Sequence, residues 1–155
     1  MIQIRHGDAT KMGYVTTGFW TGLTVGRVGL GFVIGYFKLG EEWFVTCLIV
    51  LGIVCLLVLW LVPVLVVSAI CAALFGFVIG PLFPTIVVVA LKKLPTRLHV
   101  SGVGFAAAIG GAGAAILPFI NGTLSDHFGP KVLGPFCVSL FGAMLVLWLA
   151  VVKWF

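Results

Sequence analysis

Arg27 is the residue with the clearest capacity for chemistry, because it is the only charge in the apolar stretch of residues 12–37. An arginine at the centre of a bilayer costs about 2.5–3.5 kcal/mol on insertion scales, so such residues usually face a bundle interior or a watery cavity. At about 100° per residue, Thr16, Trp20 and Thr24 fall on the helix face of Arg27. A guanidinium beside an aromatic ring suits a hydroxylated or anionic solute. We therefore predict that Arg27, Trp20 and Thr24 bind substrate.

A second interpretation of Arg27 is that its side chain reaches up to the lipid headgroups. Arg27 precedes Phe37 by ten residues, which is about 15 Å of helix. That distance puts it near the middle of a long membrane helix. The position favours a role in a cavity or between helices over a surface role.

Groups that could support catalysis or metal binding are scarce. No nucleophile lies near a base in the pattern that a hydrolytic enzyme needs, and the sequence has no phosphate-binding loop. The histidines His6, His99 and His127 are too far apart to predict a metal site. The four cysteines form no CxxC pair and are interpreted as small buried hydrophobic residues. We expect neither an enzyme nor a bound cofactor or metal.

The composition requires lipid as the solvent. Hydrophobic residues make up 62% of the chain and charged residues 8%, whereas soluble domains carry about 25% charged residues. A soluble globule of this size buries only about 70% of its surface and could not hide so many apolar side chains. The net charge of +5 is distributed between the apolar runs, which is typical of basic loops at a membrane surface. Nucleic-acid binding would need a clustered basic stripe and is not expected.

The apolar runs predict an all-α, polytopic bundle of about five transmembrane helices that forms a single domain over residues 1–155. Each run reaches the roughly 20 residues that a membrane helix needs, and none alternates with the period of two that barrel strands show. The predicted spans are residues 12–37, 43–62, 64–91, 100–120 and 132–152. The predicted connections are residues 38–42, a turn at Pro63, and the segments 92–99 and 122–131.

Small residues recur at every fourth position in the first and fourth spans, where they favour close packing between helices. The simpler interpretation is that glycine and alanine are common in membrane helices. The stripe of the fourth span is too wide for one neighbour, so we expect a second partner, which could lie outside this chain. The predicted packing residues are Gly18, Gly22 and Gly26 in the first span, and Gly102, Ala106, Gly110 and Ala114 in the fourth.

The third span contains Pro81 and Pro84, each of which removes a backbone donor and clashes with the preceding turn. We therefore predict a kink at this point. Bent helices at the membrane midplane often line a solute path. A kink that neighbouring helices absorb, with no role in transport, is the alternative.

Loop charges predict the orientation of the chain. One side carries Arg5, Lys11 and Lys131, and the other carries the larger set of Lys38, Lys92, Lys93, Arg97 and Lys153. We place the second side in the cytosol, which makes the C-terminus cytosolic in a multi-pass integral membrane protein.

Three segments together resemble the C-terminal half of a major facilitator superfamily transporter, most of all a fungal fucose-permease-like member. They are TGFWTGLTVGRVGLGFV (17–33), GPLFPTIVV (80–88) and LHVSGVGFAAAIGGAGAAILPF (98–119). The resemblance implies that the five spans correspond to helices eight to twelve of a twelve-helix secondary transporter for a sugar or another small organic solute. It also implies that the first and fourth spans contact the missing N-terminal half.

Two departures from the superfamily pattern stand out. The loop between the first two spans reads GYFKLGEEW, with Glu41 and Glu42 in place of the usual basic motif, and a motif-like GTLSDHFGPK (122–131) falls in the opposite loop. The chain also lacks the first seven helices, so we expect a fragment or a truncated gene model. The alternative is a non-transporting membrane protein, or a defunct truncation that acts at most as an assembly partner.

Overall fold

The chain forms an all-α bundle in a computed structural model that describes residues 9–37, 40–62 and 64–154. The all-α prediction is thus confirmed. Arg5, Lys38 and the turn expected at Pro63 lie outside the described residues. The helices are α2 (Ala9–Phe37), α3 (Glu41–Leu61), α4 (Leu65–Ile79), α5 (Leu82–Lys93), α6 (His99–Phe128) and α7 (Leu133–Trp154), with short 3-10 turns η1 (Thr96–Leu98) and η2 (Pro130–Val132).

Four helical segments are long and apolar enough to cross a membrane. They are Glu41–Leu61, Leu65–Lys93, Thr96–Phe128 and Pro130–Trp154. Helix α2 has 29 residues but is not among the four, because its glycines, threonines and Arg27 dilute its apolar content. The four spans indicate a multi-pass membrane protein embedded in a lipid bilayer.

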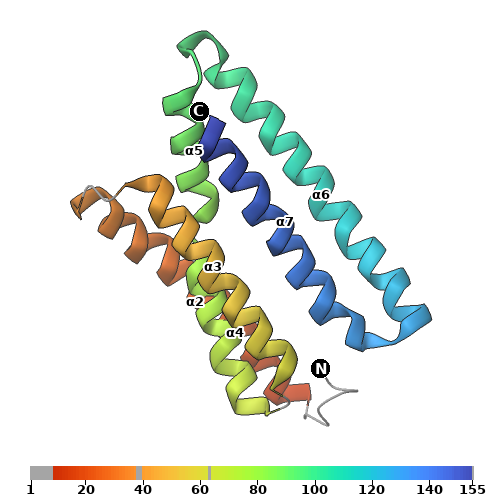
Figure 1. Cartoon of the computed structure of the whole chain (residues 1–155). Helices are drawn as coiled ribbons and strands as arrows, with labels where there is room; N and C mark the ends of the chain where they lie inside the picture. The colour runs from red at the N-terminus through yellow and green to blue at the C-terminus, as the bar shows by residue number, and fades with distance from the viewer. Residues whose placement is uncertain (1–8, 38–39, 63, 155) are drawn as a thin grey trace.

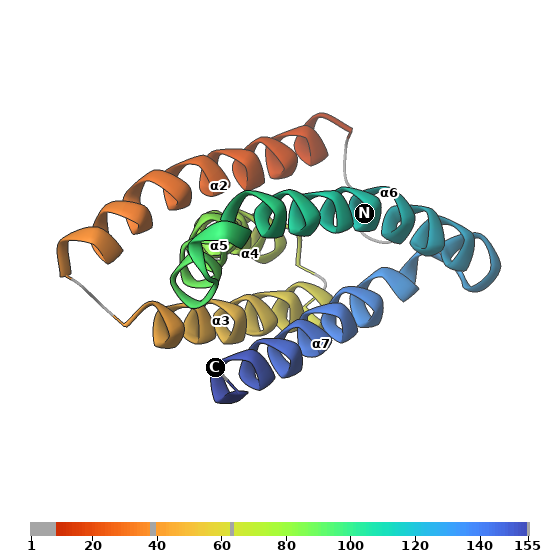
Figure 2. The same ribbon diagram turned by 90° about the horizontal axis from the view of Figure 1, so that it is seen from above.

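The helices divide into a packed group and a peripheral helix. Helix α4 lies between α2 and α3, and α7 lies along α3 (Figures 1 and 2). Helix α6 runs along the outside, antiparallel to α7, and contacts the rest of the molecule mainly near its ends. No residue of α6 is buried.

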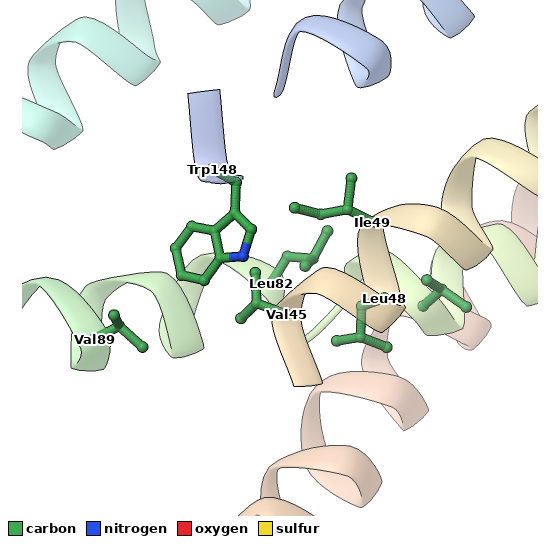
Figure 3. Close-up of a cluster of buried hydrophobic side chains, with 7 residues drawn as sticks. Val45, Leu48, Ile49, Leu82, Val89 and Trp148 are labelled. Atoms are coloured by element: carbon green, nitrogen blue, oxygen red, sulfur yellow. The ribbon is translucent and has the colours of Figure 1, made fainter. Parts of the chain in front are cut away.

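The apolar core joins α3, α4, α5 and α7. Its members are Val45, Leu48, Ile49, Val78, Leu82, Val89 and Trp148, and Figure 3 shows the Trp148 ring against Val45 and Leu82. The Trp148 Nε1 donates to the Thr46 Oγ1 at 3.0 Å, and that hydroxyl donates to the Glu42 carbonyl at 2.8 Å. The indole is therefore held by both apolar contact and a polar link.

The third span is two helices rather than one. Helix α4 ends at Ile79 and α5 starts at Leu82, with Gly80 and Pro81 between them in right-handed helical conformation. Prolines at positions 81 and 84 remove two backbone donors, three residues apart, from this segment, which explains the interruption. Pro81 is fully buried at the break.

The fourth helix is longer than predicted, so the expected loop of residues 122–131 is mostly wrong. Helix α6 continues through these polar residues to Phe128. Polarity does not prevent a helix, and the Thr123 hydroxyl bonds the Ile120 carbonyl along its own turn at 2.9 Å. The helix ends where Gly129 adopts φ 83°, a conformation that favours glycine, and Pro130 follows.

Candidate functional site

The four residues predicted to share a face of α2 are all exposed within this chain. They are Thr16, Trp20, Thr24 and Arg27, and the Trp20 side chain is 59% exposed. The Thr24 hydroxyl donates to the Trp20 carbonyl one turn earlier at 2.9 Å. Its oxygen lone pairs remain as acceptors, while Arg27 offers only donors. The face thus combines an aromatic plane, an acceptor and a cation.

The other side of α2 is pressed against α4. A Cβ added to Gly22 would collide with the Ala73 carbonyl, and one added to Gly26 would collide with the Phe77 carbonyl. On α4, a Cβ at Gly76 would collide with the Phe19 carbonyl. Gly18 is less tightly placed, since its Cβ would lie 3.7 Å from the Ala73 Cβ. Backbones at this separation can form weak Cα–H···O contacts.

Arg27 contacts the break between α4 and α5. Its Nε donates to the Gly80 carbonyl oxygen at 3.2 Å, across 53 residues of sequence. A Cβ on Gly80 would lie 2.8 Å from the Arg27 backbone nitrogen, so the two backbones also meet here. The structure therefore brings Arg27 together with the kinked segment. Sequence reasoning placed both features but did not connect them.

The small residues of α6 have far fewer neighbours than those of α2. A Cβ on Gly102 would lie 3.3 Å from a Leu94 side-chain carbon, whereas one on Gly110 would meet nothing within 4 Å. Ala106 and Ala114 are exposed. Among the described residues, no helix packs along this stripe.

Two ion pairs join the start of α3 to the end of α5. The Lys92 Nζ lies 2.6 Å from the Glu41 Oε1, and the Lys93 Nζ lies 2.8 Å from the Glu42 Oε1. The acidic residues that depart from the superfamily loop motif are thus partners of the basic KKLPTR segment. Sequence analysis noted both groups separately, and only the antiparallel course of the helices shows that they meet.

An open, mostly apolar groove is lined by residues of α2, α3, α4, α6, η2 and α7. Its polar groups include Asn121, Ser125 and Lys131. The Asn121 Oδ1 is buried and has no hydrogen-bond partner among the described atoms. Beside it, the Trp60 ring lies so close to Gly134 that a Cβ there would collide with the indole.

Metal-binding groups do not gather in the described part of the chain, where no three His, Cys, Asp or Glu side chains come together. The cysteines Cys47, Cys55, Cys71 and Cys137 are all unpaired.

The fold and its exposed faces define a multi-pass α-helical membrane protein. Comparison with curated proteins finds similarity to "Bypass of stop codon protein 6" of Saccharomyces cerevisiae. The two sequences are 34% identical over 155 aligned positions, which cover 91% of this chain. The chain spans about a third of the yeast protein, since the alignment covers 31% of its length. No family model matches the chain, and no solved structure matches it significantly.

Proposed function

We propose that this chain is the C-terminal part of a major-facilitator-type secondary transporter that moves a sugar or another small organic solute. In this proposal α2 is also a span, and the five spans are helices eight to twelve of twelve. The observation that carries the proposal is the exposed face of α2. It sets Trp20, Thr24 and Arg27 in one row on a helix whose opposite side is already packed.

The surroundings of this row support a solute path. In lipid, an exposed guanidinium and hydroxyl would be costly, so such residues usually face a cavity or another part of the protein. A midplane site between two halves would cover them. The match to 31% of a longer relative fits a chain that works with further spans. The break at Gly80 and Pro81 lies directly beside this face, through the Arg27 contact.

The proposed orientation puts the C-terminus in the cytosol. Lys92 and Lys93 end α5, Arg97 lies in η1, and Lys153 is in the last turn of α7. The helix directions bring these four cations to one end of the bundle (Figure 1). A cytosolic position for that end follows the preference of Lys and Arg for cytosolic loops.

The test is to clone the genomic reading frame with its upstream sequence and to measure uptake into proteoliposomes. Labelled hexoses and small organic acids are the probes. We expect Trp20→Ala and Thr24→Val to lower uptake about tenfold, equivalent to about 1.4 kcal/mol of binding energy. Trp43→Ala is the matched control, because Trp43 is 79% exposed at the start of α3 and away from this face.

Two results would contradict the proposed transport, and a third would contradict only the assignment of the site. An upstream sequence that encodes no further spans, or a full-length protein without uptake, would favour the non-transporting assembly partner. Normal uptake by the Trp20 and Thr24 variants would remove these residues from the site while leaving transport itself intact.

A further inference from the structure

The segment between α4 and α5 has a backbone acceptor whose helical donor does not exist. In an α-helix, the carbonyl of Gly80 would accept from the N–H of residue 84. Residue 84 is proline and has no N–H. An unpaired backbone carbonyl inside a bilayer costs several kcal/mol, because no water is available to replace the missing donor.

The donor comes from another helix. The Arg27 Nε of α2 donates to this same Gly80 oxygen at 3.2 Å, in a partly buried contact. Hydrogen bonds from a charged donor are roughly twice as strong as neutral ones. The guanidinium is planar and holds its N–H donors in a rigid fork, so the direction of the Nε–H follows from the placement of the side chain.

Glycines on both helices make the contact geometrically available. Gly26 and Gly80 lie where the two backbones meet, and any side chain on either would collide with the opposite helix or press against it. The Phe77 carbonyl, which Pro81 deprives of its donor in the same way, faces Gly26. Helix α2 therefore lies against both carbonyls that the prolines leave without helical donors, and it supplies a donor to the one of Gly80.

We propose that Arg27 is a positioning residue that replaces the N–H lost at Pro84 and thereby fixes the break between α4 and α5. Its Nε holds the Gly80 carbonyl, although Arg27 as a whole residue is exposed. This role is independent of the proposed transport function, since it requires only the α2–α4 contact within this chain.

A double-mutant cycle on the full 155-residue chain in detergent micelles tests the proposal. Arg27→Met keeps most of the apolar stem and removes the donor, while Pro84→Ala restores a backbone N–H to the Gly80 carbonyl. We expect Arg27→Met alone to lower the midpoint of thermal unfolding by on the order of 5 °C. In the Pro84→Ala background the same substitution should lower it by less than half as much.

Pro118→Ala is the matched control for the proline. Pro118 also lies inside a helix, but in α6, and its helical acceptor is Ala114, which is distant in sequence from Gly80. Arg27→Met should lower the unfolding midpoint equally with and without Pro118→Ala. The unfolding midpoint of Arg27→Lys should lie between those of the wild type and Arg27→Met, because the lysine ammonium retains a charged donor on a more flexible stem.

Each outcome of this cycle either supports or overturns the proposed role of Arg27. Equal destabilisation by Arg27→Met in the Pro84 and Pro84→Ala backgrounds would overturn the proposal, since Arg27 would then act without the Gly80 carbonyl. If Arg27→Met fails to fold, recovery of a folded chain in the double variant supports it, and failure of both variants overturns it. Because the readout is stability rather than uptake, a negative result here leaves the proposed transport function standing.

Discussion

Helices α2 and α6 carry the same kind of small-residue pattern in opposite surroundings. Gly22 and Gly26 on α2 touch the backbone of α4, whereas Gly110 on α6 has open space around it. The difference lies in the opposite helix. Helix α4 presents Gly76 to α2, Gly80 meets α2 at the break that follows α4, and no described helix presents such a surface to α6. A stripe of small residues therefore encodes the capacity for close approach but does not specify the partner.

The largest expected effect is in the packed group. Trp148 is 6% exposed and joins α7 to the core and to Thr46. We expect Trp148→Ala to lower the free energy of unfolding by about 3–5 kcal/mol, as for other large-to-small core substitutions. Phe105→Ala on α6 is the control, because that ring is 70% exposed, and it should change stability by less than about 0.5 kcal/mol. Denaturant titration in micelles, followed by circular dichroism, measures both.

A Trp148→Ala chain as stable as the wild type would mean that α7 does not depend on this core. Equal losses for Trp148→Ala and Phe105→Ala would erase the distinction between the packed group and α6.

The glycines test the comparison directly. Gly22→Ala must displace α4, because its Cβ would collide with the Ala73 carbonyl, and we expect a loss of about 1–3 kcal/mol from overpacking. Gly110→Ala meets nothing within 4 Å and should cost nothing, with a gain of up to about 1 kcal/mol from helix propensity. Thermal unfolding of the two variants in the same detergent provides the measurement. A loss at Gly110 as large as that at Gly22 would show that α6 is packed in solution.

The smallest expected effect is at the ion pairs. The Lys92 side chain is 64% exposed and that of Glu41 is 21% exposed, and pairs of this kind contribute about 0–1 kcal/mol. Lys92→Ala should therefore lower stability by no more than about 1 kcal/mol, with a smaller loss at high salt because exposed charges are screened. Lys131→Ala, at the opposite end of the bundle, is the control. A loss that does not change between low and high salt would argue against an electrostatic origin.

Local features of the sequence predicted the fold better than they predicted the site. The apolar runs revealed the helices, since lipid allows few other structures, and Pro81 and Pro84 marked the interruption between α4 and α5 because their effect on the backbone is local. The polar residues after Ile120 predict a loop, but such residues are compatible with a helix, and α6 continues to Phe128.

Contacts between distant residues were beyond the sequence pattern. The bond from Arg27 to Gly80 spans 53 residues, and the pair of Glu41 with Lys92 spans 51. Periodicity assigns a residue to a face of its own helix and contains no information about which helix lies opposite. Arg27 was therefore recognised as unusual, while its backbone partner was not.

The two ion pairs change the electrostatic role of Lys92 and Lys93 between the unpaired sequence and the folded bundle. In the rule that Lys and Arg favour cytosolic loops, Lys92 and Lys93 both count, because nearby acidic residues contribute little to that preference. After folding, Glu41 and Glu42 neutralise both. An anionic lipid surface attracts each unpaired cation by about 1 kcal/mol, so among the described residues of this end Arg97 and Lys153 are the cations left to attract such lipids. The same two lysines thus count as free charges in the sequence and as neutralised pairs in the folded bundle.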